Sequence, residues 1–152
     1  MKRNAFFIFL IRTNTILFIL LFLLVFHGFS YVTFLLPEEA SIGSDLLTSP
    51  FRKVIIGIIL GPLAETLLFQ TLIIMIICKF VKRPRYSLYL SIFLSASLFA
   101  LNHNYNIYYI GYTFVAGTIF AFAYYIGRYK RFSPTLTVFF IHALYNALVI
   151  YT

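Results

Sequence analysis

The sequence predicts an all-α, polytopic membrane protein, a transmembrane helical bundle of about five spans. Of its 152 residues, 62% are hydrophobic and only 11% are charged, whereas about a quarter of the residues in a soluble domain are charged. The charged residues fall in short clusters between long apolar runs. Because every backbone group inside a bilayer must be hydrogen-bonded internally, such runs are expected to be helices. The chain length predicts a single domain, residues 1–152.

The uncharged runs give the expected positions of the spans. Residues 13–37 contain no Asp, Glu, Lys or Arg, residues 54–78 contain only Glu65, and residues 86–127 and 132–152 contain none. A span needs about 20 residues, so the run 86–127 predicts two helices with a break near Asn102–Asn106. The expected spans are therefore approximately 14–36, 54–78, 86–103, 107–127 and 133–151. The first is too long for the apolar region of a signal peptide and is expected to be retained.

The distribution of positive charge predicts the orientation. With a cytoplasmic N-terminus, ten of the twelve Lys and Arg residues fall in cytoplasmic segments, as the positive-inside rule requires. The outer loop holds Arg52 and Lys53 and the acidic residues Glu38, Glu39 and Asp45. We expect a multi-pass protein of the cell (inner) membrane with an extracytoplasmic C-terminus. Lipid headgroups account for the basic clusters, so the lipid bilayer is the expected partner and nucleic acid is not.

Four polar side chains interrupt the apolar runs: Glu65, His103, His142 and Asn146. An ionisable residue at the centre of a membrane helix costs about 2.5–3.5 kcal/mol and usually marks a functional site. The spacing of His142 and Asn146 places both on one helix face. Pro62 removes a backbone donor and predicts a bend one turn before Glu65. The structural alternative is that Glu65 only hydrogen-bonds a neighbouring helix.

Two other residues, His27 and Cys78, are of types that often have a function, but we assign no function to them. His27 lies near the outer end of the first span and is interpreted as an interfacial residue. Cys78 is a lone cysteine in an apolar run, where it is expected to act as a small hydrophobic side chain. The tyrosines near the span ends, among them Tyr105, Tyr108 and Tyr109, are interpreted as an interfacial belt.

Three motifs that follow one another along the chain contain these four polar residues and resemble those of a known family. The chain has Glu65-Thr66-x-x-x-Gln70, then Phe99-x-x-x-His103, then His142-x-x-x-Asn146. Over about residues 54–150 it resembles the CPBP family, the CAAX proteases and bacteriocin-processing (Abi) intramembrane proteases. The pattern of that family is Glu-Glu-x-x-x-Arg, Phe-x-x-x-His and His-x-x-x-Asn, so Thr66 and Gln70 depart from it.

The resemblance implies a catalytic set. It makes Glu65 the general base, His103 the residue that shares its water, and His142 with Asn146 the pair that stabilises the oxyanion. It gives supporting roles to the aligned residues Thr66, Gln70 and Phe99. The implied function is a glutamate-dependent intramembrane endopeptidase that cleaves a membrane-associated peptide or protein near the bilayer surface. The expected partner is a hydrophobic or lipidated peptide, and five spans leave self-association into a homo-oligomer open.

The sequence favours a reaction without a metal and leaves zinc as the alternative. A catalytic zinc requires three protein ligands and a water, which Glu65, His103 and His142 could supply. No second carboxylate lies in any expected span to act as the base. We therefore expect no cofactor.

Two other functions remain open. The first is a catalytically silent membrane binder, such as a bacteriocin self-immunity protein, which the departures at Thr66 and Gln70 favour. The second is a proton-coupled transporter that uses Glu65 and the histidines as a relay, although the sequence lacks the internal repeats of many transporters.

Overall fold

The computed structural model describes residues 5–31 and 49–151, and all regular elements in these two ranges are helical. The all-α prediction is therefore confirmed. The helices are α1 (Ala5–Arg12), α2 (Thr15–Ser30), a continuous rod over Pro50–Phe80, α6 (Pro84–Leu101), α7 (Ile107–Gly127) and α8 (Pro134–Tyr151). The last residues of the first expected span, 32–36, and the charged residues Lys2, Arg3, Glu38, Glu39 and Asp45 lie outside the described residues.

Three of the described helices are long and apolar enough to cross a membrane: Pro50–Phe80, α7 and α8. The described part of the first expected span, α2, is apolar but has only 16 residues. The fourth long helix, α6, carries serines at positions 87, 91, 95 and 97, which lower its hydropathy. The chain is therefore a helical membrane protein, and the count of five spans stays a prediction.

A short helix that the charge pattern did not predict precedes α2. Helix α1 ends at Arg12, and Asn14 then caps α2 by accepting a hydrogen bond from the Leu17 backbone at 2.9 Å. An Asn at this position satisfies one of the unpaired amides at a helix start. The polar pair Thr13–Asn14 thus separates two helices inside one apolar stretch.

The rod changes its helical winding around the proline. Helix α4 (Gly61–Glu65) lies between the π-helical segments Lys53–Leu60 and Thr66–Leu72, and α3 (Pro50–Arg52) and α5 (Ile73–Phe80) complete the rod. Pro62 has no amide to donate, which favours a change of hydrogen-bond pattern here. The Gly61 amide reaches back to the Ile56 carbonyl, and a Cβ on Gly61 would lie 2.7 Å from that oxygen. Only glycine fits this turn, which leads directly into Glu65.

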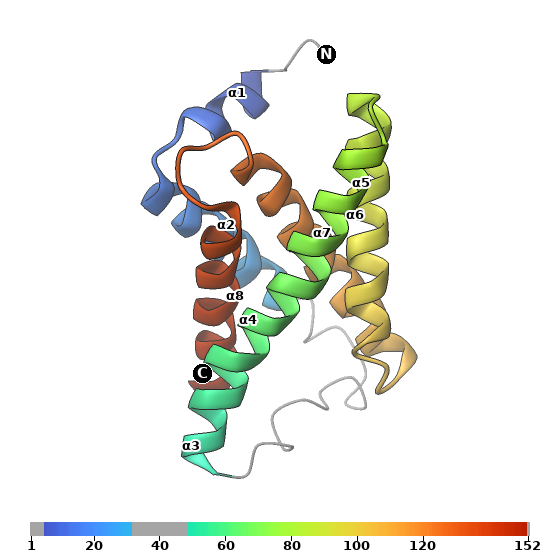
Figure 1. Ribbon diagram of the computed structural model, residues 1–152. Helices are drawn as coiled ribbons and strands as arrows, with labels where there is room; N and C mark the ends of the chain where they lie inside the picture. The colour runs from blue at the N-terminus through green and yellow to red at the C-terminus, as the bar shows by residue number, and fades with distance from the viewer. Residues whose placement is uncertain (1–4, 32–48, 152) are drawn as a thin grey trace.

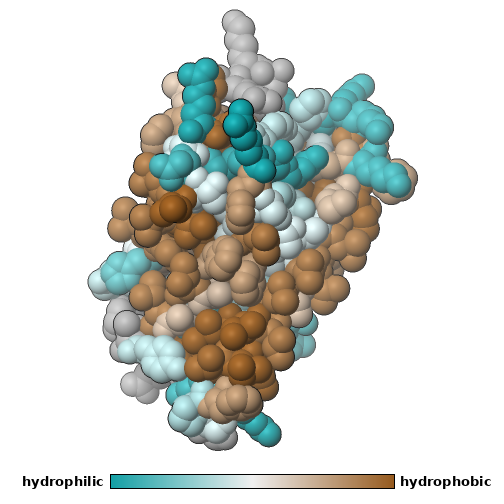
Figure 2. Space-filling view, turned by 60° about the vertical axis from the view of Figure 1, so that its left-hand side comes forward, coloured by the Kyte–Doolittle hydropathy of each residue, from teal (hydrophilic) through white to brown (hydrophobic). Residues whose placement is uncertain are grey.

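The helices run up and down, so their connections gather at two ends (Figure 1). Helix α1, the α5–α6 connection and the α7–α8 connection lie at the upper end of Figure 1, which is also the end that Figure 2 shows to be rich in hydrophilic side chains. The start of α3 and the α6–α7 connection lie at the lower end. This arrangement places the basic clusters of residues 79–85 and 128–131 at the same end of the bundle (Figure 1), and the orientation of that end in the membrane stays a prediction.

The core is aromatic and closely packed. Phe26 of α2 contacts Phe120 of α7 and Tyr145 of α8, with ring centroids 4.4 and 4.7 Å apart. Helices α6 and α7 approach at Gly117, where a Cβ would lie 3.1 Å from the Cα of Ala96, as the small-residue interpretation of Gly117 predicts. Below the hydrophilic end, Figure 2 shows a broad hydrophobic surface, which suits contact with lipid.

Candidate active site

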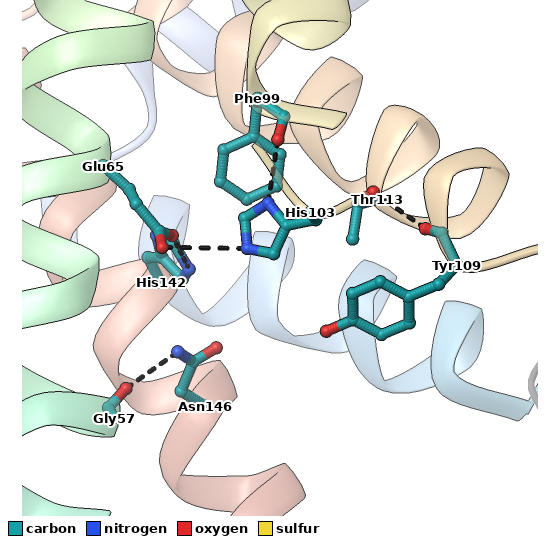
Figure 3. A network of polar contacts seen from close by, with 8 residues as sticks. All are labelled: Gly57, Glu65, Phe99, His103, Tyr109, Thr113, His142 and Asn146. Carbon is teal, nitrogen blue, oxygen red and sulfur yellow. Dashed lines mark hydrogen bonds and ion pairs between the residues drawn. The ribbon is translucent and has the colours of Figure 1, made fainter. Parts of the chain in front are cut away.

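The four candidate catalytic residues come from three parts of the bundle. Glu65 is the last residue of α4, and His103 follows the end of α6. His142 and Asn146 lie one turn apart on α8. The tertiary structure brings these segments together (Figure 3), although 77 positions separate Glu65 from His142 along the chain.

The carboxylate of Glu65 lies between the two imidazoles. Its Oε1 is 3.7 Å from Nε2 of His103, and its Oε2 is 3.5 Å from Nε2 of His142. Both distances exceed an ordinary hydrogen bond, which for N–H···O is 2.7–3.2 Å. The side chains of Glu65 and His103 are 22% and 17% exposed, whereas that of His142 is 4% exposed. The site is therefore open on the Glu65–His103 side and closed behind His142.

The hydrogen bond that His103 makes shows which of its two ring nitrogens carries the proton. Nδ1 of His103 lies 2.8 Å from the carbonyl oxygen of Phe99. A carbonyl only accepts, so this bond requires the proton on Nδ1 and leaves Nε2 with a lone pair in the neutral ring. That lone pair faces Oε1 of Glu65, and two acceptors that face each other are satisfied by a donor placed between them. A water molecule is such a donor.

His142 has the opposite arrangement. Its Nδ1 is buried and has no hydrogen-bond partner among the described residues. A proton on Nδ1 would lack an acceptor, whereas a proton on Nε2 can be donated to Oε2 of Glu65. The ring is held against Phe120 with centroids 4.3 Å apart. His142 is thus suited to donate a hydrogen bond, and His103 to accept one.

Asn146 adds a second hydrogen-bond donor to α8, one turn after His142. Its Nδ2 donates to the Gly57 carbonyl of the first π-helical segment at 2.9 Å. This bond fixes the orientation of the amide, and the second hydrogen of Nδ2 remains available to another acceptor. Helix α8 and the rod are held together at the same point.

Phe99 lies beside the two histidines of the site, and Thr66 and Gln70 are buried in the rod. The Phe99 ring lies 4.6 Å from the His103 ring and 5.8 Å from the His142 ring. Thr66 and Gln70 are 0% exposed, and neither Oγ1 of Thr66 nor the Gln70 amide has a hydrogen-bond partner in the described chain. Both belong to the buried residues of the rod, together with Pro62 and Ile74.

Sequence reasoning missed one neighbour of the site, Tyr109, and the structure places His27 beside Tyr31 of its own stretch of chain. Tyr109, assigned to an interfacial belt, has its ring centroid 6.1 Å from that of His103. Its position after Asn106, which caps α7, was the signal that places it in the first turn beside the α6–α7 connection. His27 lies outside the site, with Nε2 3.3 Å from the Tyr31 hydroxyl.

The donor set fits a metal poorly. Within the described ranges, no group of three or more His, Cys, Asp or Glu side chains is arranged to hold a metal ion. Glu65, His103 and His142 are the three that a zinc ion would use, and they would have to rearrange around it.

A family model described as type II CAAX prenyl endopeptidase Rce1-like matches residues 47–148, about two thirds of the chain. The matched region includes the rod, the α6–α7 connection and α8 as far as Leu148, and therefore all four site residues. No curated protein and no solved structure matches the chain.

Proposed function

Because the chain belongs to the type II CAAX prenyl endopeptidase Rce1-like family, we propose that it is an intramembrane endopeptidase that cleaves a hydrophobic or lipidated peptide near the bilayer surface. Membership confirms the family resemblance seen in the three sequence motifs. The observation that carries the proposal is the position of the Glu65 carboxylate, 3.7 Å from His103 and 3.5 Å from His142.

In the proposed reaction, a water molecule between Glu65 and the Nε2 lone pair of His103 is the nucleophile. Glu65 accepts its proton as the water oxygen attacks the peptide carbonyl. The carbonyl oxygen becomes negatively charged and is stabilised by Nε2–H of His142 and the second Nδ2 hydrogen of Asn146. The proton held by Glu65 then passes to the leaving amine, which breaks the C–N bond and restores the carboxylate.

Each step uses a group whose protonation its contacts already favour. The Phe99 carbonyl holds the proton of His103 on Nδ1, so Nε2 can accept. The lack of an acceptor near Nδ1 of His142 favours its proton on Nε2, so Nε2 can donate. We propose that the reaction needs no metal, and that the protein lies in the cell membrane with a cytoplasmic N-terminus.

The test compares purified wild type with Glu65→Gln in lipid nanodiscs, using a farnesylated CAAX peptide, its unprenylated counterpart and detection of products by mass spectrometry. We expect Glu65→Gln to lower kcat/KM by about 10²–10⁴-fold, the usual contribution of a general base. The matched control is Tyr108→Phe, a side chain 45% exposed. Equal cleavage by wild type and Glu65→Gln would refute the proposal.

A second arm of the same experiment addresses zinc. A strong chelator should leave the rate of the wild-type protein unchanged. If the chelator abolishes cleavage and added zinc restores it, then the metal-free mechanism is wrong, and Glu65, His103 and His142 are ligands.

A further inference from the structure

Tyr109 is held in place by both of its backbone groups. Oδ1 of Asn106 accepts a hydrogen bond from the Tyr109 amide at 2.8 Å, and the Thr113 hydroxyl donates to the Tyr109 carbonyl at 2.8 Å. The ring also packs against Tyr105, with centroids 5.3 Å apart. The first turn of α7 therefore gives the Tyr109 side chain a fixed direction.

That direction is toward the site. Figure 3 shows the ring extending from α7 with its hydroxyl leading, on the side where His103 and Asn146 lie. The rings of Tyr109 and His103 are 6.1 Å apart. The hydroxyl thus borders the same space as the carboxylate and imidazole that would hold the water.

The hydroxyl is available, in contrast to those of its neighbours. The hydroxyls of Tyr112 and Tyr145 are hydrogen-bonded to each other between α7 and α8. Tyr108 is 45% exposed on the outside of the same turn. The Tyr109 hydroxyl has no hydrogen-bond partner in the described part of the chain, and its residue is only partly exposed. A half-buried phenol beside a polar site usually finds a partner.

The geometry points to Tyr109 as a residue that contacts the substrate, its hydroxyl hydrogen-bonding the backbone of the peptide bound between α7 and the rod. This inference rests on the proposed function, because it identifies a further contact of the same site. The hydroxyl lies on the α7 side of the peptide, opposite Asn146 on α8. It therefore contributes to holding the peptide in the site and leaves the stabilisation of the oxyanion to the donors of α8.

The test measures peptide binding separately from cleavage. Binding of a fluorescently labelled farnesylated CAAX peptide is measured in nanodiscs by anisotropy, in a Glu65→Gln background where the peptide stays intact. Adding Tyr109→Phe should weaken binding by about three- to tenfold, the effect of losing one neutral hydrogen bond. Adding Tyr108→Phe should leave binding unchanged. In the otherwise wild-type protein, Tyr109→Phe should raise KM by a similar factor and change kcat by less than about twofold.

Three results would overturn the inference: unchanged affinity in Tyr109→Phe, no peptide binding at all, or an equal loss in Tyr112→Phe, whose hydroxyl bonds Tyr145 and therefore reports on bundle stability. Failure of the proposed function looks different. If the wild type cleaves nothing but Tyr109→Phe still weakens binding, then the contact holds and the peptidase proposal fails. If cleavage depends on Glu65 and Tyr109→Phe binds normally, then the peptidase holds and the contact fails.

Discussion

The two ends of the bundle use polar side chains in different ways. At the basic end, Nζ of Lys130 donates to the carbonyls of Leu10 and Ile11 in the last turn of α1 and of Thr13 just after it. These carbonyls would otherwise be left unpaired at a helix end. The same ammonium lies 4.6 Å from the centre of the Phe18 ring. These contacts join the α7–α8 connection to α1 and α2, which indicates a structural role for Lys130.

At the site, the polar groups face each other without completing hydrogen bonds. Glu65 lies 3.5–3.7 Å from the two imidazoles, and Nδ1 of His142 is buried without a partner among the described residues. Unsatisfied buried polar groups cost about 1–3 kcal/mol each. A protein retains such groups where a water or substrate completes them. The difference teaches that the site combines a carboxylate with two imidazoles that it does not fully pair, whereas the charged group of the basic end is hydrogen-bonded to backbone carbonyls.

The largest expected effect in this comparison is on catalysis. His142→Leu removes a donor aimed at the oxyanion, so kcat should fall by about 10²–10³-fold, measured with the farnesylated peptide. His27→Leu is the matched control, since the His27 side chain packs against Tyr31 of its own stretch of chain, and it should retain wild-type kcat. An equal loss in both variants would show that histidine content, rather than position, matters.

The next effect is on stability alone. Lys130→Met keeps the aliphatic stem and loses the hydrogen bonds to α1, so the free energy of unfolding should fall by about 1.5–3 kcal/mol, the value for a bond to a charged group. Thermal unfolding in detergent measures this, and kcat/KM should stay at the wild-type value. Arg131→Met, on an exposed neighbour, should change neither quantity. If Lys130→Met lost activity without losing stability, then the role of Lys130 would not be structural, and the contrast between the basic end and the site would be wrong.

The smallest effect concerns the thiol of the basic end. Cys78 accepts hydrogen bonds from the Ser87 hydroxyl at 3.1 Å and from the Arg128 guanidinium. Cys78→Ala should lower the free energy of unfolding by about 1 kcal/mol or less and leave cleavage unchanged. If a thiol-blocking reagent inhibits the wild type but not Cys78→Ala, then the thiol has a role in the reaction that its structural contacts do not explain.

The motifs predicted the site residues because the requirement for them is local. A carboxylate or imidazole inside an apolar run can be recognised from the sequence alone. The same is true of the helix face that His142 and Asn146 share through their i,i+4 spacing. Thr66 and Gln70 were grouped with the site by motif position alone. The structure buries both of them in the rod, and their part in the reaction stays a prediction.

Other features depend on contacts between distant segments, and no local pattern contains them. The break at Thr13–Asn14 separates α1 from α2, and Lys130 secures the end of α1 from a loop more than a hundred residues away. From the sequence, Tyr109 is interpreted as an interfacial tyrosine. In the folded structure, the capped start of α7 directs its ring toward His103.

The sequence by itself determined the helical membrane class, the approximate helix positions and the identity of the four polar residues, because the cost of placing polar groups in hydrocarbon makes each of them conspicuous. The tertiary structure decided which nitrogen of each histidine faces Glu65, the orientation of the Asn146 amide and the approach of Tyr109. Those depend on a carbonyl, a ring or a carboxylate supplied by another helix. The protonation state and the orientation of a side chain depend on neighbours that it acquires only when the chain folds.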